Sequence, residues 1–481
     1  MRILGAFVLV LALVGGVLYW LLQPPAPLPA PERGGAFHNI TVIQPGESRR
    51  EGQSLTITDR TIGDITPSAD ASESPYAGKY VLPGLINMHA HHPPQNIPVA
   101  QDLFPLLFLM HGVTTVRDAG DIDGKTVLPI RRKIEAGAMP GPRVFACGPF
   151  VDGPEKIWEN TRVVTDPAKA VDVVRSIKAD GYDCVKLYNS LAPDVLAALI
   201  AAAKDQGMPT IGHVSHHVPY PGGIGDVQHF TGAAFAPNTD PRSFPEVMDA
   251  WGTPFDDAQL ARTVEATLAA GAANTPTLVT TAKFSNYDRY EEMRASPEAA
   301  LLPRYFADVI WHPKDGLRRD TSAKNMSRLK TAIPAVQRLI KRLHESGAKL
   351  HIGTDTMTAF VIPGVDMHEE MRLFVESGIP LEEVWKIATS GNGAHLKQGL
   401  GRLEPGAPAD LLIFREDPTK DLANLATLEA VIADGRIYTK ADLDERFARL
   451  KAQWSNPIVD PIMTEAVRMA MARFREERSE E

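Results

Sequence analysis

Short apolar runs alternate with longer amphipathic stretches between residues 80 and 400 of this chain. Eight of the runs are typical of buried strands, because they are rich in β-branched or apolar residues and are bounded by Gly, Pro or polar residues. Helical spacing of apolar residues separates most of them, at 167–180, 192–206, 257–270 and 333–346. This alternation predicts an α/β fold, a closed (β/α)8 TIM-like barrel of eight parallel strands. The predicted strands are 81–88, 113–117, 143–147, 184–187, 210–213, 227–230, 275–280 and 350–353.

Two regions outside this alternation have β patterning of their own. Short β segments at 38–43 and 54–58 lie between Gly, Pro and Ser residues, and similar segments at 409–414 and 430–438 follow the barrel. We expect them to form one small split β-sandwich domain. Residues 284–330 break the barrel pattern and predict an insertion between the seventh and eighth strands. The expected domains are a split β domain at 37–80 and 400–440, a barrel at 81–399 and a helical tail at 441–481.

An unbroken run of apolar, aromatic and glycine residues occupies positions 3–22. About 20 such residues suffice to cross a bilayer as a helix, and Tyr19 and Trp20 suit the membrane interface. We therefore expect a transmembrane anchor at 1–23 and a Pro-rich stalk at 24–36. Arg2 favours a cytoplasmic N-terminus, which makes the catalytic domain extracytoplasmic, at the periplasm or the cell surface. A cleaved signal peptide and an exported enzyme are the alternative.

Composition restricts the partners and the chemistry of the rest of the chain. Hydrophobic residues make up 44% and charged residues 23%, as in soluble globular proteins. Lys and Arg are scattered and the formal net charge is -9, so we expect no nucleic acid partner. Cys147 and Cys184 lie in apolar strand-like runs, where we expect two small buried side chains and no disulfide framework.

Polar residues close several of the apolar runs. The C-terminal ends of barrel strands carry the functional side chains, so these positions are informative. His89 and His91 end the first run, and a spacing of two places both imidazoles on one face of a strand. A lone histidine of this kind is more often a hydrogen-bonded core side chain than a ligand. An ordered set is different, and further strand ends carry Lys186, His213, His229 and Asp355.

Lys186 is the unusual member of this set. A lysine that points into a closed barrel is a costly unpaired charge unless its chemistry is altered. A carbamate formed with carbon dioxide would make it an anionic ligand able to bridge two metals. Neutral imidazoles are common ligands of zinc and similar ions.

The sequence resembles the amidohydrolase superfamily, nearest to its imidazolonepropionase-like and Xaa-Pro-dipeptidase-like branch, over roughly residues 37–440. Besides the strand ends, four stretches carry the resemblance: LPGLI at 82–86 before the His-x-His, GVTTVRDAG at 112–120, GPR at 141–143 and EPGAPADLL at 404–412.

The resemblance implies a role for each strand-end residue. His89 and His91 would hold the more buried metal, and carboxylated Lys186 would bridge to a second metal on His213 and His229. Asp355 would complete the first site and move protons. Asn87 stands where relatives usually have Asp, and by strand parity it faces the same way one step deeper, which favours a supporting role over ligation.

Two divalent ions roughly 3.5 to 4 Å apart lower the pKa of a shared water to about 7, and the metal-bridging hydroxide can attack a carbonyl carbon. Asp355 would pass the proton to the leaving nitrogen. The sequence therefore predicts a binuclear amidohydrolase, with zinc as the default metal, that cleaves an amide C–N bond in a small molecule or dipeptide. Hydrolysis of a cyclic amide or imidazolone, or a deamination, is the alternative. A catalytically silent barrel scaffold is the alternative of another class, and it predicts lost ligands.

Weaker candidates lie near these strand ends. Tyr188, His217 and Tyr220 could bind substrate, although packing or plain exposure is about as plausible for each. Arg117 and Asp118 are interpreted as an internal ion pair with a structural role. Whether the chain forms a homo-oligomer is left open.

Overall fold

The computed structural model describes residues 23–69, 74–233, 256–314, 316, 323–396 and 399–480. The apolar run at 3–22, predicted as a membrane anchor, lies outside the described residues. Among the residues that are described, no helix is both long and apolar enough to span a bilayer.

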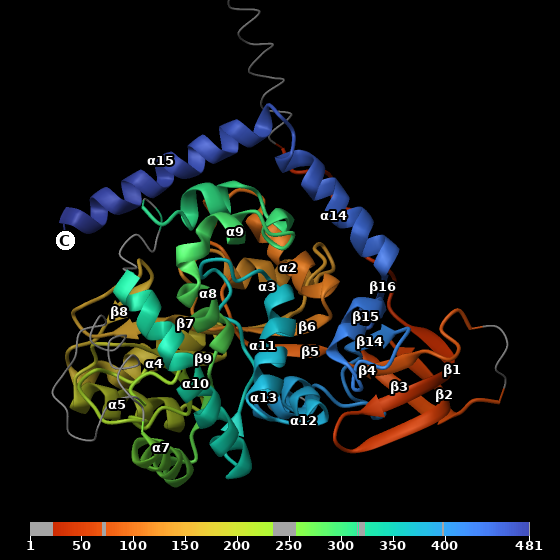
Figure 1. The fold of residues 1–481 in the computed structure, drawn as a ribbon, viewed down its shortest axis with the longest axis horizontal. Helices are drawn as coiled ribbons and strands as arrows, with labels where there is room; N and C mark the ends of the chain where they lie inside the picture. The colour runs from red at the N-terminus through yellow and green to blue at the C-terminus, as the bar shows by residue number, and fades with distance from the viewer. Residues whose placement is uncertain are drawn as a thin grey trace, which may run out of the picture.

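A curled sheet of parallel strands forms the larger part of the molecule (Figure 1). Backbone hydrogen bonds join its first strand to the segment that follows its last strand. The Met88 N–H donates to the Ile352 carbonyl (2.9 Å), and the Thr354 and Asp355 N–H groups donate to the His89 carbonyl. The arrangement is consistent with the predicted TIM-like barrel. Its strands in spatial order are β5 (Leu85–Ala90), β6 (Val113–Asp118), β7 (Arg143–Asp152), β9 (Cys184–Leu187), β10 (Thr210–Gly212), β11 (Asp226–Gln228), β12 (Ala273–Thr275) and β13 (Lys349–Leu350), and β8 (Thr161–Val163) pairs with β7.

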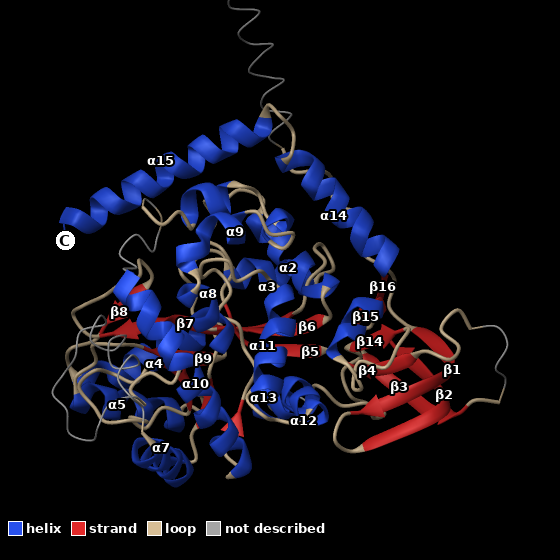
Figure 2. Cartoon of the chain, viewed as in Figure 1, coloured by secondary structure: helices blue, strands red, loops and turns tan. Residues whose placement is uncertain are grey.

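Helices connect most of these strands and lie outside the sheet (Figure 2). The four predicted helical stretches are confirmed, because their apolar positions repeat at helical spacing and pack into the main core. These and the neighbouring helices are α2 (Ala100–Met110), α3 (Val127–Glu135), α4 (Ala170–Ala179), α5 (Pro193–Asp205), α7 (Asp257–Ala270), α10 (Ala323–Glu345), α11 (Val365–Glu376), α12 (Leu381–Lys386) and α13 (Asn392–Leu396).

Several predicted strand limits differ from the structure, and the first and seventh runs show why. The first run is divided between β4 (Tyr80–Pro83) and β5, which belong to different sheets. Gly84 joins them, and a Cβ at this position would lie 1.9 Å from Thr114 Oγ1. The seventh run is wrong beyond Thr275, because Thr277 has a φ of 49° and α8 (Leu278–Ser285) begins immediately after it.

The second sheet brings together strands from both ends of the chain. β14 runs antiparallel to β4, and the Ile62 N–H donates to the Ala407 carbonyl (2.8 Å), so the sheet folds over its own apolar core as a β-sandwich. The exact limits of the domains stay a prediction. The strand order is β16 (Arg436–Thr439), β15 (Leu428–Ala433), β14 (Leu411–Phe414), β4, β1 (Gly35–Gln44), β2 (Ser48–Thr58) and β3 (Thr61–Pro67).

A separate apolar cluster lies under the C-terminal helices α14 (Lys440–Trp454) and α15 (Val459–Glu480). Its aromatic side chains come largely from the segment that interrupts the barrel pattern, which contains α9 (Tyr290–Arg294) and a π-helical turn at Phe306–Ile310. Trp311 and Phe306 are fully buried there. The described part of the predicted insertion is therefore a packed helical layer.

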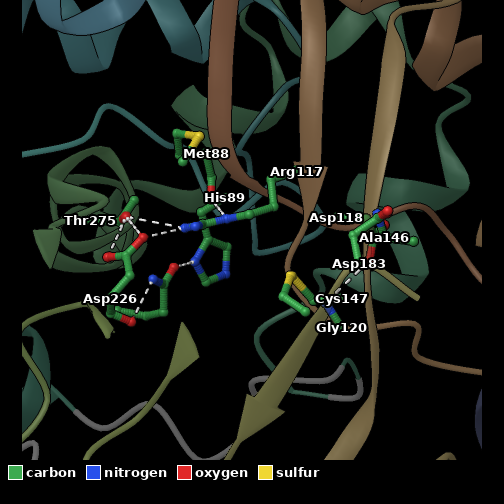
Figure 3. The surroundings of a disulfide bond; sticks show 12 residues. Met88, His89, Arg117, Asp118, Gly120, Ala146, Cys147, Asp183, Asp226 and Thr275 are labelled. Carbon is green, nitrogen blue, oxygen red and sulfur yellow. Dashed lines mark hydrogen bonds and ion pairs between the residues drawn. A yellow bond between two sulfur atoms is a disulfide. The ribbon is translucent and has the colours of Figure 1, made fainter. Parts of the chain in front are cut away.

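The expectation of two unbonded cysteines is wrong. Cys147 in β7 and Cys184 in β9 are register partners on adjacent strands, and they form a disulfide across a sequence separation of 37 residues (Figure 3). The prediction that both cysteine side chains are buried in apolar strands is confirmed. Strand register, which brings the two sulfurs together, is not visible in the sequence.

Candidate active site

Four imidazoles converge at the C-terminal ends of the barrel strands. His89 is the penultimate residue of β5, His91 directly follows that strand, His213 follows β10 and His229 follows β11. The ring centroids of His89 and His229 lie 4.6 Å apart, and those of His213 and His229 lie 5.1 Å apart. The Nε2 atoms of His89 and His91 are separated by 3.3 Å. The structure thus brings together the histidines that the sequence singled out.

Each of these imidazoles has its Nδ1 occupied by an oxygen atom. His89 Nδ1 contacts Gln228 Oε1, His91 Nδ1 lies 3.0 Å from the Gly120 carbonyl, and His213 Nδ1 lies 2.8 Å from Asn189 Oδ1. Carbonyl and amide oxygens only accept, so Nδ1 must donate in these three rings. His229 Nδ1 lies 2.5 Å from Thr277 Oγ1. This pattern leaves Nε2 as the lone-pair nitrogen, as in histidines oriented to bind metal.

Asp355 adds a carboxylate to the histidines. Its Oδ1 lies 3.1 Å from His89 Nε2 and 3.5 Å from His91 Nε2. Ligand atoms of His89, His229 and Asp355 all lie within 4.8 Å of one another. Imidazole nitrogens and a carboxylate are the donors that zinc and related ions prefer, so these residues fit a metal site.

The electrostatics of the cluster suit this donor set. Burial lowers the pKa of His89 to about 4 and holds the pKa values of His213 and His229 well below their usual range. Burial alone would raise the pKa of Asp355, but His229 and His89 outweigh it and hold that pKa well below its ordinary value. Burial therefore favours the neutral form of the His89, His213 and His229 imidazoles, whereas the Asp355 carboxylate is ionised at neutral pH.

Lys186 lies in β9 and is completely buried, with its Nζ 5.9 Å from the ring centroid of Tyr188. Burial lowers the pKa of its amine to about 7, an effect that Asp355 partly opposes. A neutral amine is the form that reacts with electrophiles, so the position is compatible with a carbamate.

Positive backbone dihedrals cluster at this rim. His229, Thr277 and Asp355 have φ values of 57°, 49° and 56°. Non-glycine residues rarely adopt this region, and where they do the surrounding structure enforces it, often at functional sites.

Asn87 supports the site from below, as strand parity predicts. Its Oδ1 accepts from the His89 N–H (3.1 Å) and the Thr354 N–H (3.2 Å), and its Nδ2 donates to Thr354 Oγ1 (2.8 Å). It therefore ties β5 to the segment that carries Asp355.

Arg117 and Asp118 do not form the ion pair that the sequence suggested. Arg117 donates to the Met88 carbonyl and pairs with Asp226 at 2.5 Å (Figure 3). Asp118 instead contacts His92 Nδ1 at 2.8 Å. Successive residues of a strand point to opposite faces, which separates the two side chains. Asp226 also accepts from Thr275 and contacts His351, so its carboxylate is fully used in holding the barrel strands together.

The three candidate substrate residues have different surroundings. Tyr188 stacks on His213 at 4.4 Å and borders the cluster. The Tyr220 hydroxyl contacts Thr267, on α7, and Asn274, on β12, and is thus engaged with the outer helix and its neighbouring strand. His217 is exposed on its loop, with its backbone N–H donating to the Ser215 hydroxyl.

Aromatic side chains that the sequence reasoning missed extend the surroundings of Tyr188. Phe150 lies edge-on to Tyr188 at 5.1 Å and stacks with Trp158 at 5.7 Å. Trp158 Nε1 donates to the Tyr188 hydroxyl (3.2 Å), and Phe150 also stacks with His91. We call Phe150, Trp158 and Tyr188 the aromatic wall.

The oxygen acceptors of the imidazoles were also missed. Gln228, Asn189 and Thr277 each lie at or just beyond a strand end. Polar residues at strand ends close to a predicted ligand could therefore have been predicted as its hydrogen-bond partners.

The fold and this cluster define an α/β barrel protein with a His/Asp centre that could hold metal. The amidohydrolase family model matches residues 80–438, and this chain belongs to the amidohydrolase family. The resemblance inferred from the sequence is thereby confirmed. Membership supports a hydrolase that acts on C–N bonds.

Solved structures show the same fold. A bottromycin amidohydrolase is 24% identical, with a TM-score of 0.68 and coverage of 90% of this chain and 92% of that chain. A Xaa-Pro dipeptidase with bound methionine in its active site is 22% identical, with a TM-score of 0.60 and coverage of 84% and 100%. No match was found among curated proteins.

Proposed function

We propose that this protein is a binuclear, metal-dependent amidohydrolase that cleaves an amide bond in a small molecule or dipeptide. The observation that carries the proposal is the common orientation of four imidazoles, each with Nδ1 bound to an oxygen and Nε2 left for a shared centre. Histidines that served only the core would not need this arrangement. The similarity in fold to a Xaa-Pro dipeptidase and a bottromycin amidohydrolase supports the substrate class.

The residues divide into two ligand groups in this proposal. His89, His91 and Asp355 hold one ion, His213 and His229 hold the other, and carboxylated Lys186 bridges them. Zinc is the expected metal, although such ligands also accept manganese, iron or cobalt. When bound, the ions supply an activated water and polarise the substrate carbonyl.

Asp355 handles the proton. Its pKa is held low by His229 and His89, so it meets the substrate as a carboxylate and acts as a base. It accepts a proton from the attacking water and transfers it to the amide nitrogen, because that nitrogen leaves poorly until it is protonated.

The aromatic wall bears on the choice of substrate. Phe150 stacks with the ligand His91, and Tyr188 stacks with the ligand His213, so the wall lies directly beside the reacting centre. Such rings favour an apolar or aromatic group on the substrate. A dipeptide with an apolar residue next to the cleaved bond meets this requirement.

The test is an assay of the purified, zinc-loaded full-length protein against a dipeptide panel that includes Xaa-Pro members, with cyclic imides and lactones in parallel. We expect turnover of dipeptides, and loss of turnover in His213→Ala. His38→Ala, at an exposed position on β1 outside the site, is the matched control and should retain activity. Turnover of cyclic substrates alone would reject the dipeptide proposal in favour of a cyclic amide hydrolase. Absence of any turnover in protein that binds no metal would indicate a scaffold.

We also propose that the enzyme is membrane-anchored, with the barrel outside the cytoplasm. The apolar run at 3–22 supports an anchor, and the buried Cys147–Cys184 disulfide suits an oxidising compartment. Protease added to intact cells, or to spheroplasts where an outer membrane encloses the periplasm, should degrade the barrel while the cytoplasmic membrane stays closed. A barrel that is cleaved only after lysis would contradict this location.

A further inference from the structure

One face of the C-terminal helix α15 carries three apolar side chains that the described residues leave exposed. Ile458 is 53% exposed, Ile462 is 37% exposed and Met469 is 53% exposed. Ile458 directly precedes α15, and the spacings of four and seven residues place the three side chains on one helical face. We call these residues the α15 stripe. The other large hydrophobic residues with high exposure in the described part of the chain, Val163, Val171 and Leu268, lie on other elements.

A different face of the same helix packs on the body of the protein. Val459, Met463 and Val467 are buried in the apolar cluster beneath α15. The helix is therefore held in place by its inner face, and the α15 stripe is not needed to fix its position. An exposed stripe of this kind is typical of a surface that meets a partner.

The N-terminal segment is fastened beside this helix. Arg446, on α14, donates to the Leu28 carbonyl (2.9 Å) and the Pro29 carbonyl (2.6 Å). Gln453 Nε2, in the last turn of α14, donates to the Gln23 carbonyl (2.9 Å). The chain thus reaches the end of α14 at residue 23, next to the corner where α15 begins (Figure 1).

This attachment leaves no free spacer between the apolar run and the body of the enzyme. The run ends at residue 22, and residue 23 is already bound to α14. A membrane that contains the run must therefore lie close to the α14–α15 corner, where the α15 stripe starts.

We propose that the α15 stripe lies in the surface of the membrane that holds the N-terminal run. The anchor keeps the stripe at the bilayer, so even a weak apolar contact is maintained at high effective concentration. Glu465 lies on the same face, three residues after Ile462 and four before Met469, and its carboxylate pairs with Arg468. Over residues 459–473 the two acidic residues Asp460 and Glu465 balance Arg468 and Arg473. The contact is therefore apolar, and it does not depend on anionic lipid or on salt.

The test uses full-length protein reconstituted into phosphatidylcholine vesicles that contain a phospholipid with a photoreactive acyl chain. After illumination, mass spectrometry of the peptides locates lipid adducts. We expect adducts on the α15 stripe at low and high salt, and their loss when Ile458, Ile462 and Met469 are all replaced by Ser. The matched control replaces Val163, Val171 and Leu268 by Ser and should leave the α15 adducts unchanged.

Unchanged hydrolase activity and thermal unfolding would show that the substituted proteins are folded. Adducts confined to the N-terminal run would overturn the proposal. So would protection of the stripe by a second copy of the chain, detected as a protein–protein crosslink through α15 in place of lipid adducts.

Discussion

Gln228 illustrates how single residues around the site determine what the histidines can do. Its Oε1 contacts His89 Nδ1, and its Nε2 donates to the Asp226 carbonyl at 3.1 Å, so the amide is held at both ends. The strand-end position of His89 was predictable from its apolar run. The acceptor was not, because Gln228 lies on β11, which reaches His89 only after the sheet has curled.

We predict that Gln228→Leu lowers metal affinity and activity by about 10- to 100-fold, because His89 loses the oxygen that fixes its ring and tautomer. A chelator competition titration and kcat/KM measure the two effects. Gln206→Leu, at the end of α5, is the matched control and should change neither. Normal metal affinity in Gln228→Leu would show that the acceptor does not orient His89.

At the scale of elements, the short helix α8 depends on one buried carboxylate. Glu370, on α11, accepts from the Leu278 N–H (2.9 Å) and the Val279 N–H (2.6 Å). These are the first two residues of α8, whose N–H groups have no partner within the helix. Thr277, which contacts His229, directly precedes them, so α11 holds the rim of the site through α8.

Glu370→Ala should therefore lower the free energy of unfolding by about 2 kcal/mol, because two buried N–H groups lose their acceptor. Urea denaturation measures the change. Glu376→Ala, at an exposed position of the same helix, should shift it by less than about 0.5 kcal/mol. Equal effects of the two substitutions would contradict a capping role for Glu370.

The same carboxyl predicts a pH dependence of stability. Burial raises the pKa of Glu370 to about 8, although the two N–H donors oppose the shift. The folded state therefore binds more protons than the unfolded state between the two pKa values, and this group reduces stability as pH rises from about 5 to about 8. Glu370→Gln cannot ionise. Its stability relative to the wild type should increase across that window in urea titrations, and a constant difference would refute the raised pKa.

The sequence predicted helices better than strand limits, for a physical reason. Helical periodicity is local, and 257–270 matches α7 residue for residue. The run at 81–88 is continuously hydrophobic because both of its halves are buried. Gly84 nevertheless divides it between two sheets. The disulfide, the partners of Arg117 and the acceptors of the imidazoles depend on strand register and sheet closure. None of these has a local signal.

At the scale of the whole molecule, the N-terminal and C-terminal parts of the described chain contact each other in two places. The strands β14–β16 join β1–β4 in one sheet, and the Pro-rich segment before β1 runs along α14. The Pro-rich segment is therefore held by side-chain contacts from Gln23 to Pro31, where Arg436 donates to the Pro31 carbonyl. Side chains of the body of the protein donate hydrogen bonds to backbone carbonyls of this segment. Proline residues lack an N–H donor but keep the carbonyl acceptor, so a Pro-rich segment can be bound in this way.

Arg446 is the main link, since its guanidinium is buried, pairs with Asp442 at 2.9 Å and binds two carbonyls of the segment. We predict that Arg446→Ala releases the segment without changing kcat/KM. A spin label at Ala26→Cys should become more mobile in this variant. Arg449→Ala, at an exposed position of the same helix, should leave the label as immobile as in the parent. If mobility did not change in Arg446→Ala, the remaining contacts would suffice to hold the N-terminal segment against α14.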